Sequence, residues 1–409
     1  MEEKIRILHV LGRLDRGGAE TMVMNLYRHM DHSRIQFDFV IHTRDTCDYT
    51  AEVLALGGRI YAMMPFRAAT ALLYGKAWRR FFREHPEYKV IHGHMRSTAS
   101  LYLHEARRAG LVTIVHSHNT SSGSGFSALV KNMLQYPLRF QADYLFACSR
   151  AAGIWLYGRS ACGTDRFRLL VNATEPERFR FCGEVRTAKR KELLAPCDGG
   201  AQPFVFLHIG RLEEQKNHRF LLQIMAEIRK CAPGAELWLC GMGPLEEELR
   251  RQAEKEGLEA AVCFLGTRTD VPALMQAADV LLFPSLFEGL PVTLVEAQAA
   301  GLPVLMSDTV TREVILTDLV RTLSLHESAA QWARIALEMA QSGSCGSDMA
   351  RGRADNGRAA YADKIRLCGY DAAENAGRLA RFYEKVSASE SRPGKKHHDG
   401  DRSGRNNRK

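Results

Sequence analysis

Short apolar runs recur along the chain, and the segments between them carry apolar residues at helical spacing. In the first half, strand-like runs are predicted at 5–11, 37–43, 59–64, 90–94, 113–118, 144–149 and 167–172. A second series follows at 204–210, 236–241, 262–266, 280–285 and 304–308. Strands that alternate with helices are typical of a parallel sheet with helices on both faces. The sequence therefore predicts an α/β protein with two Rossmann-like β/α/β halves.

Changes in composition divide the chain into parts. The stretch between the two series has no strand character, the pattern after Asp308 is helical, and the last residues are basic and rich in Ser, Gly, Arg and Asn. Such a tail cannot bury enough apolar surface to fold, so it is predicted to be disordered. The predicted parts are a first domain at 1–183, a linker at 184–202, a second domain at 203–368, a last helix at 369–386 and the basic tail at 387–409.

The stretch 280–303 joins a strand, a loop and a helix. The apolar run 280–285 predicts a buried strand, which leads to Glu288 and Gly289 in a tight loop. Pro291 suits the first helical position, and the helix is expected over 293–300, until Gly301-Leu302-Pro303 ends it. Glu288 should therefore lie just outside the carboxyl end of a parallel strand, where open α/β sheets bind ligands.

The two acids of this stretch suit different tasks. Glu296 lies five residues into the predicted helix, roughly 7 to 8 Å along its axis. The unpaired amides of the first helical turn and the positive end of the helix dipole favour a phosphate between the two acids. Glu288 and Glu296 could then hold hydroxyl groups on either side of it, which is the layout of a nucleotide sugar. The alternative is that both are solvated charges at a helix start.

Glu288 and Glu296, with seven residues between them, reproduce the E-x7-E signature of retaining GT-B glycosyltransferases, and the chain resembles glycosyltransferase family 4 (group 1), including members of capsule and exopolysaccharide synthesis. The resemblance extends over roughly residues 5–386 and is strongest at 210–308. It implies the GT-B fold, with an acceptor-binding first domain facing a nucleotide-sugar-binding second domain across a cleft. It also implies that the last helix crosses back to the first domain. A simple terminal helix is the alternative.

The resemblance implies further substrate-binding residues on the loops that follow the strands. Arg211 and Lys216 follow the strand at 204–210, where they could converge on a diphosphate, although two such cations are often just solvated. The Gly241-Met242-Gly243 turn partly resembles a dinucleotide-binding fingerprint, but Glu246 occupies the position of its third glycine. The resemblance to the glycosyltransferase family implies instead that this turn, with Gly243, is part of the substrate-binding site. The remaining implied substrate-binding residues are Gly17, Gly18, Thr267, Val271, Gly289, Leu290, Pro291, Val292 and Glu296.

Histidines end two neighbouring predicted strands of the first half: His92 and His94, then His116 and His118. They raise the possibility of a metal site, but no recognised ligand spacing accompanies them, so no metal is expected. The resemblance implies one histidine here that contacts the donor. His118 fits that position better than His116, which is retained as a substrate-binding candidate, and the expected catalytic residues are His118 and Glu288.

The segment 171–179 departs from the family pattern of Asn-Gly-Ile-Asp followed by a Phe. Asn172 and Phe179 are present, but Ala173 replaces the Gly and Glu175 replaces the Asp. The local geometry at this point between the domains is therefore expected to differ from the family's usual form.

The net charge of +9 is concentrated in the first 150 residues and the tail, which suggests an anionic partner. No aromatic-rich RNA motif or helix-turn-helix signature supports nucleic acid. The helix predicted at 72–83 mixes apolar and basic residues and suits either a membrane interface or the core. The sequence has no long apolar run and no signal-peptide pattern, so the protein is expected in the cytoplasm. The ten cysteines include no C-x-x-C pair and are expected to be reduced thiols.

The resemblance implies a retaining transfer of a hexose-type sugar from a nucleotide diphosphate donor, expected to be a UDP-sugar. The acceptor would be a saccharide or lipid-linked oligosaccharide in surface polysaccharide synthesis, and association with the membrane face is expected. No metal or other cofactor is implied. A sugar-nucleotide epimerase on the same architecture and a catalytically silent nucleotide-sugar-binding protein are the alternatives.

Overall fold

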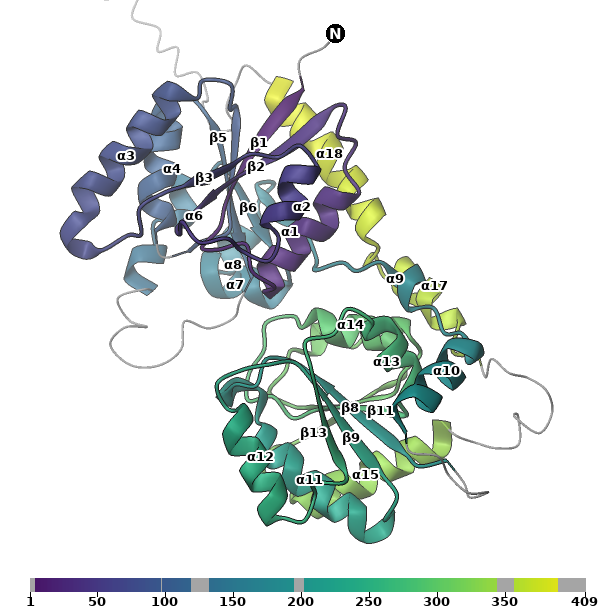
Figure 1. The fold of residues 1–409 in the computed structure, drawn as a ribbon. Coiled ribbons are helices and arrows are strands. Elements are labelled where there is room, and N and C mark those ends of the chain that lie inside the picture. Colours follow the sequence, from purple (N-terminus) through teal and green to yellow (C-terminus); the bar gives the residue numbers. More distant parts are fainter. Residues whose placement is uncertain (1–3, 97, 119–131, 195–201, 344–356, 389–409) are drawn as a thin grey trace, which may run out of the picture.

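The computed structural model describes residues 4–96, 98–118, 132–194, 202–343 and 357–388. Two parallel sheets form separate domains, one above the other in Figure 1. The first sheet has seven strands in the order β3-β2-β1-β4-β5-β6-β7, and the second has six in the order β10-β9-β8-β11-β12-β13. The predicted α/β fold with two Rossmann-like halves is confirmed. The predicted tail lies, from residue 389, outside the described residues.

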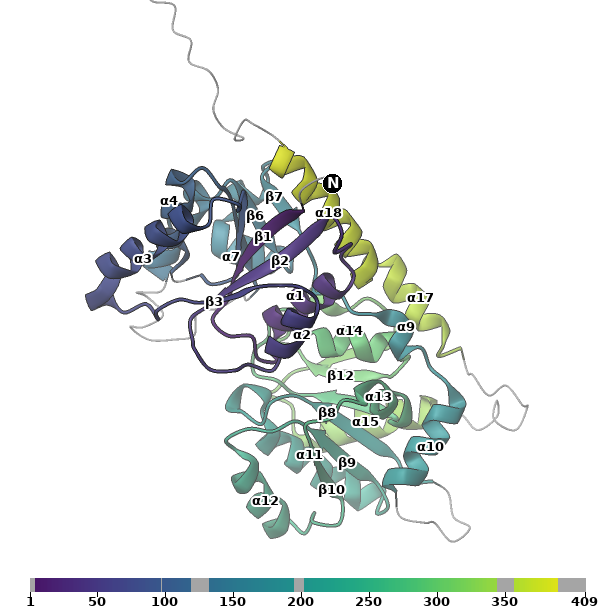
Figure 2. The ribbon, with the colours of Figure 1, turned by 45° about the horizontal axis from the view of Figure 1, so that its top comes forward.

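The first domain contains the first seven strands and the helices that cover both faces of their sheet (Figures 1 and 2). Its strands are β1 (Ile5–Val10), β2 (Ile35–Ile41), β3 (Ile60–Ala62), β4 (Val90–Gly93), β5 (Val112–Ser117), β6 (Tyr144–Ala147) and β7 (Phe167–Leu169). Its helices are α1 (Gly18–Arg28), α2 (Thr50–Ala55), η1 (Ala68–Thr70), α3 (Ala71–Glu84), α4 (Ala99–Arg108), α6 (Leu138–Gln141), α7 (Arg150–Tyr157) and α8 (Arg159–Cys162).

The second domain is also a parallel sheet covered by helices, and the chain connects it to the first domain at α9 and again between α17 and α18. Its strands are β8 (Val205–Ile209), β9 (Glu236–Cys240), β10 (Val262–Gly266), β11 (Val280–Phe283), β12 (Val304–Ser307) and β13 (Val320–Leu323). The helices are α9 (Pro176–Phe179), α10 (Gly183–Leu193), η2 (Glu214–Lys216), α11 (His218–Cys231), α12 (Glu246–Lys255), α13 (Val271–Ala277), α14 (Val292–Ala299), η3 (Arg312–Val314), α15 (Ala329–Gly343), α17 (Ala360–Leu367) and α18 (Ala372–Ala388).

Each sheet is buried because aromatic side chains cover it. Trp78 of α3 and Tyr102 of α4 lie in one core of the first domain, while Phe37 of β2 and Tyr383 of α18 lie in another. In the second domain two tryptophans are completely buried, Trp238 of β9 and Trp332 of α15. Parallel strands covered on both faces read as continuous apolar runs, which is why their positions were predictable.

The structure differs from the sequence predictions at two places. The predicted linker begins within α10, which packs against α13, and its Arg186 donates to the carboxylate of Asp279 at 2.5 Å. This helix is mostly polar, so no apolar period indicated it. The pattern after Asp308 was expected to be helical, but β13 pairs in parallel with β12 at the sheet edge. A strand of four partly exposed residues is too short to give a clear period.

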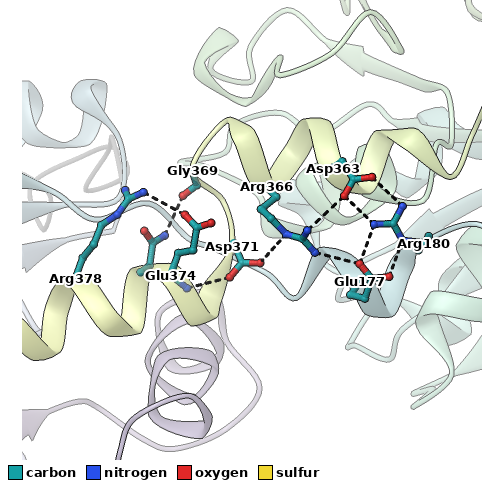
Figure 3. Close-up of polar contacts among 9 residues, drawn as sticks. Glu177, Arg180, Asp363, Arg366, Gly369, Asp371, Glu374 and Arg378 are labelled. Carbon is teal, nitrogen blue, oxygen red and sulfur yellow. Dashed lines mark hydrogen bonds and ion pairs between the residues drawn. The ribbon is translucent and has the colours of Figure 1, made fainter.

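The chain passes between the domains at α9 and again between α17 and α18, and these segments lie side by side (Figures 1 and 2). Figure 3 shows the charged contacts that join them. Arg180 binds Glu177 at 2.6 Å and Asp363 at 2.8 Å, and Arg366 binds Glu177 at 3.1 Å and Asp371 at 3.5 Å. A single exposed pair contributes at most about 1 kcal/mol. The contacts share partners, so they hold the two crossings together as a network.

The last helix returns to the first domain. Contacts of α18 are made with α1, β1 and β4, and Tyr383 is completely buried there. The bridge between Thr174 and Asp371 pairs the two crossing segments directly. Among the described residues, no helix combines the length and apolar character needed to cross a bilayer.

Candidate functional site

Two loops at the carboxyl edge of the second sheet form the centre of the site. Strands β8 and β11 are neighbours, so the loops that follow them lie together. The backbone amide of Leu286 donates to the carbonyl of Gln215 at 2.8 Å, and the Gln215 side chain donates to the carbonyl of Phe287 at 2.9 Å. These bonds fix the loop that carries Glu288 against the loop that carries Lys216.

Glu288 and Lys216 form an ion pair at this edge. Their charged atoms are 2.6 Å apart, and the side chains are only 10% and 17% exposed, respectively. The Lys216 ammonium also lies 4.9 Å from the centre of the Phe283 ring. A poorly solvated lysine next to a helix N-terminus is well placed to attract a phosphate group, and Glu288 keeps it in position.

Helix α14 begins directly after this pair and faces the first domain (Figure 1). The N-cap is Pro291, so the helix starts at Val292 and not at Pro291 as predicted. No side chain among the described residues caps it. Helix geometry leaves the amides of Val292 and Thr293 without intrahelical acceptors, so they are available to an anion. Gly289 is partly exposed, whereas Leu290 and Pro291 are buried.

Glu296 lies one turn further along α14 and is partly buried. Burial raises the pKa of its carboxyl group to about 7, and the nearby Arg178 acts in the opposite direction. The Thr174 hydroxyl donates to this carboxyl group at 3.5 Å. Asn172 donates to the carbonyl of Leu290 at 3.2 Å. The segment that departs from the family pattern therefore contacts the E-x7-E stretch from the first domain.

Other predicted residues have different surroundings. The Arg211 side chain is 72% exposed and pairs with Glu213 at 2.9 Å, so it does not converge with Lys216 in this structure. A Cβ atom at Gly243 would lie 2.4 Å from the carbonyl oxygen of Leu212, so this glycine allows two loops to pack closely. The exposed Thr267 precedes α13, which starts at the partly exposed Val271.

The two glycines of the first loop start α1. Gly17 is its N-cap, and a Cβ atom there would lie 2.3 Å from the Glu20 carboxylate. A Cβ atom at Gly18 would meet no other atom within 4 Å. The Glu20 carboxylate is the end of a flexible side chain that can move aside, so packing requires neither glycine, and Gly18 leaves open space at the start of α1.

His118 follows β5 and is partly exposed, whereas His116 is completely buried within the sheet. The Nε2 atom of His118 lies 2.9 Å from Nδ1 of His94, whose Nε2 in turn lies 3.0 Å from Nδ1 of His9. Burial lowers the pKa of His118 to about 3, so the ring is neutral at physiological pH. His116 has no surface to offer a substrate here, and His118 is the histidine at the edge of the sheet.

A contact that the sequence did not indicate joins the two domains. The carboxylate of Glu313, in the second domain, accepts hydrogen bonds from the amides of Arg150 and Ala151 at 2.7 and 2.6 Å. These amides start α7 of the first domain, where a negative charge is favoured by the helix dipole. Glu313 therefore caps a helix of the other domain. No local motif marks it, because its partners lie more than 160 residues away in the sequence.

Two parallel-sheet domains, an acid-flanked helix start at the edge of the second sheet and a last helix that returns to the first domain define the class as GT-B glycosyltransferases. Comparison with known proteins supports this. The model "Glycosyl transferases group 1" matches residues 203–342, and "Glycosyltransferase Family 4" matches residues 16–178. EpsF of Bacillus subtilis, to which glycosyltransferase activity is ascribed, is 36% identical over 92% of this chain and 96% of its own. The chain belongs to glycosyltransferase family 4 and is a glycosyltransferase.

Two further proteins are similar to this chain, one in sequence and one in fold. The Escherichia coli enzyme named UDP-Gal:alpha-D-GlcNAc-diphosphoundecaprenol alpha-1,3-galactosyltransferase is 26% identical over 54% of this chain and 58% of its own. The crystal structure of Anabaena HepE in complex with UDP has a TM-score of 0.73 at 19% identity, over 94% of this chain and all of HepE. The similarity to HepE concerns the fold alone and confirms the GT-B architecture.

Proposed function

We propose that this enzyme transfers a hexose-type sugar from a UDP-sugar to a saccharide or lipid-linked oligosaccharide acceptor, with retention of the anomeric configuration, in surface polysaccharide synthesis. The observation that carries the proposal is the Lys216–Glu288 pair beside the uncapped start of α14, with Glu296 one turn further on. This edge offers two acids on either side of a seat for a diphosphate, and a sugar nucleotide has matching groups.

Each charged group has a distinct task in this proposal. The diphosphate lies against the amides of Val292 and Thr293 and the Lys216 ammonium. The Glu296 carboxylate accepts hydrogen bonds from the ribose hydroxyls, and Glu288 holds the sugar. Arg211 reaches the diphosphate only by leaving Glu213, and its 72% exposure allows this rotation.

The reaction takes place on one face of the sugar. The acceptor hydroxyl attacks the anomeric carbon from the side on which the nucleotide leaves, the carbon–oxygen bond to the diphosphate breaks, and the leaving phosphate oxygen takes the hydroxyl proton. Positive charge develops on the sugar ring and negative charge on the diphosphate. The enzyme contributes positioning and stabilisation of that negative charge by Lys216 and the helix amides, and no metal or other cofactor is needed.

The acceptor class is inferred from the relatives. The E. coli enzyme is named for a diphosphoundecaprenol-linked acceptor, in which the sugar is attached to a lipid. In this chain, Leu72 and Leu73 at the start of α3 are 85% and 56% exposed, and basic residues follow on the same helix. The aromatic residues of α3 are instead buried in the core. We therefore assign membrane-face association to the start of this helix, with anionic lipid as its partner.

Vesicle binding tests that association. Wild-type protein should co-sediment with vesicles containing anionic lipid, and the double variant Leu72→Ser, Leu73→Ser should lose most of this binding without a change in melting temperature. The matched variant Leu54→Ser removes an apolar side chain of similar exposure (56%) from α2. If it lowers binding as much as the double variant does, the assignment to α3 is wrong.

Transfer is tested with a panel of labelled UDP- and GDP-sugars and membrane extract or a synthetic diphosphate-linked lipid sugar as acceptor. A UDP-sugar should give a glycosylated product with retained anomeric configuration. Glu288→Gln should lower turnover by at least about 100-fold with the fold intact, because Glu288 touches the reacting sugar. Glu247→Gln, an exposed acid on α12, is the control and should leave turnover unchanged. Epimerised sugar nucleotide without transfer, or unchanged turnover in Glu288→Gln, would refute the proposal.

A further inference from the structure

Five histidines form a ladder at the carboxyl edge of the first sheet. His9 of β1 and His92 of β4 are paired in register. His94 directly follows β4, His116 lies on β5 and His118 directly follows it, and their side chains are on the same side because side chains two residues apart share a face. Neighbouring rings stack, with centres 4.5 Å apart for His92 and His94 and 4.2 Å for His116 and His118. The ladder runs from the buried His9 to the partly exposed His118.

The ladder satisfies one geometric condition for a metal site but fails another. In each of two sets, His9, His92 and His94 or His94, His116 and His118, the ring nitrogens lie within 4.8 Å of one another. The facing nitrogens of His94 and His118 are however 2.9 Å apart, and those of His9 and His94 are 3.0 Å apart. Two ligand nitrogens of a tetrahedral zinc site are about 3.4 Å apart. The observed separations fit N–H···N hydrogen bonds instead.

His9, His94 and His118 therefore form a hydrogen-bonded chain, and each neutral ring carries one proton. Only two arrangements are consistent with it. In the first, Nδ1–H of His9 donates to His94, Nδ1–H of His94 donates to His118, and His118 holds its proton on Nδ1. In the second, every proton moves to the other nitrogen, so that His118 donates inward, His9 carries a proton on Nε2, and Nδ1 of His118 is a bare acceptor.

The surroundings of the two ends of the chain distinguish the two arrangements. Nε2 of His9 and Nδ1 of His118 are both buried and have no hydrogen-bond partner among the described residues. The His9 ring, however, lies against Phe37 and Phe39 in an apolar core, with centres 4.2 and 5.7 Å away. A proton there would be a buried donor that nothing can satisfy, and such donors are rarer in proteins than unpaired acceptors. The corresponding proton on His118 also has no acceptor among the described residues, but the His118 side chain is partly exposed at the edge of the sheet, so a bound substrate can supply one.

We propose that His9 and His94 are positioning residues that fix His118 in the tautomer with its proton on Nδ1, so that His118 presents a hydrogen-bond donor to the donor substrate. The inference rests on the proposed function, because it assigns the use of the His118 proton to sugar transfer. A neutral imidazole of undefined tautomer would present a donor for only part of the time. The chain removes that uncertainty.

The tautomer is measured directly and independently of activity by two-bond ¹H–¹⁵N correlation spectra of the histidine side chains in the full-length protein. The His118 signals are assigned by their loss in His118→Gln. The expected result is a neutral His118 with its proton on Nδ1. A proton on Nε2 of His118 overturns the proposal, even if transfer activity is present. So does a stoichiometric bound zinc ion that is lost in His94→Leu.

A pair of variants of equal size tests the effect on catalysis. The His9→Asn side chain can still donate to His94 near the former Nδ1 position, whereas His9→Leu cannot. Relative to wild type, His9→Leu should lower kcat by about tenfold with little change in KM for the UDP-sugar, and His9→Asn should recover most of the loss. Equal kcat values in the two variants, at equal melting temperatures, contradict the proposal.

Tyr383→Phe is the matched control. It removes a buried hydrogen bond of 2.6 Å between the Tyr383 hydroxyl and His92, which belongs to the ladder but not to the chain. Its kcat should equal that of wild type. If wild type itself transfers no sugar from any UDP-sugar while His118 holds its proton on Nδ1, the proposed function fails and the tautomer assignment stands.

Discussion

The titration of Glu296 gives a quantitative prediction for both stability and binding. Its carboxyl pKa is raised from 4.5 to about 7 by burial. The folded protein therefore holds this proton more tightly than the unfolded chain does, and stability falls as the pH rises from about 4.5 to about 7. At about 1.4 kcal/mol per pKa unit, ionisation costs the folded state roughly 3 kcal/mol. Glu296→Gln removes this cost. Its melting temperature should therefore be higher than that of wild type at pH 8 and equal to it at pH 4.5.

The same proton governs the affinity for the donor, because the ionised carboxylate is the better acceptor for the ribose hydroxyls. With a pKa near 7, the ionised fraction rises about tenfold between pH 6 and pH 8, and the dissociation constant should fall by the same factor. Calorimetric titration with UDP-glucose measures this. UDP itself is unsuitable, because its terminal phosphate titrates in the same range.

Glu296→Gln serves as the control in that titration and should bind UDP-glucose weakly and with no pH dependence. The reasoning is refuted if wild type and the variant show the same pH profile. If the melting temperatures differ as predicted but the affinities do not, the carboxyl group is buried as described and does not contact the ribose.

Two further predictions concern the contacts around the site. Lys216→Met leaves the carboxylate of Glu288 without its partner and should destabilise the second domain by about 1 to 3 kcal/mol. The double variant Lys216→Met, Glu288→Gln should recover part of the lost melting temperature, and no recovery would show that the two side chains are not coupled. Glu313→Gln weakens the cap of α7 by about 1 kcal/mol. Solution scattering should then show a larger radius of gyration than for the exposed control Glu327→Gln. Equal radii would mean that the cap does not hold the domains together.

Much of the fold was predictable because buried parallel strands are continuous apolar runs. The positions of most strands and the division into two halves follow from those runs, and the same pattern placed Glu288 on a loop and Glu296 on the helix that follows it. The runs do not reveal an edge strand such as β13, whose residues are half exposed, or a polar helix such as α10, in which the buried residue is Arg190.

The rest of the site depends on contacts that no local pattern encodes. His9 stands alone in the first strand, and only the pairing of β1 with β4 brings it beside the other histidines. Glu313 meets α7 only when the domains come together. The spacing placed Arg211 on the correct loop but could not tell that its side chain turns to solvent and Glu213. Spacing along the chain thus predicts which loop carries a residue, and packing decides where its side chain points.

The central claim is that the donor diphosphate lies at the start of α14 between the two acids. A crystal structure with a bound UDP-sugar tests it most directly. The claim predicts phosphate oxygens about 3 Å from the amides of Val292 and Thr293, with Glu296 on the ribose and Glu288 on the sugar. A nucleotide bound at another edge of the sheet, or at this edge without contact to either carboxylate, would contradict it.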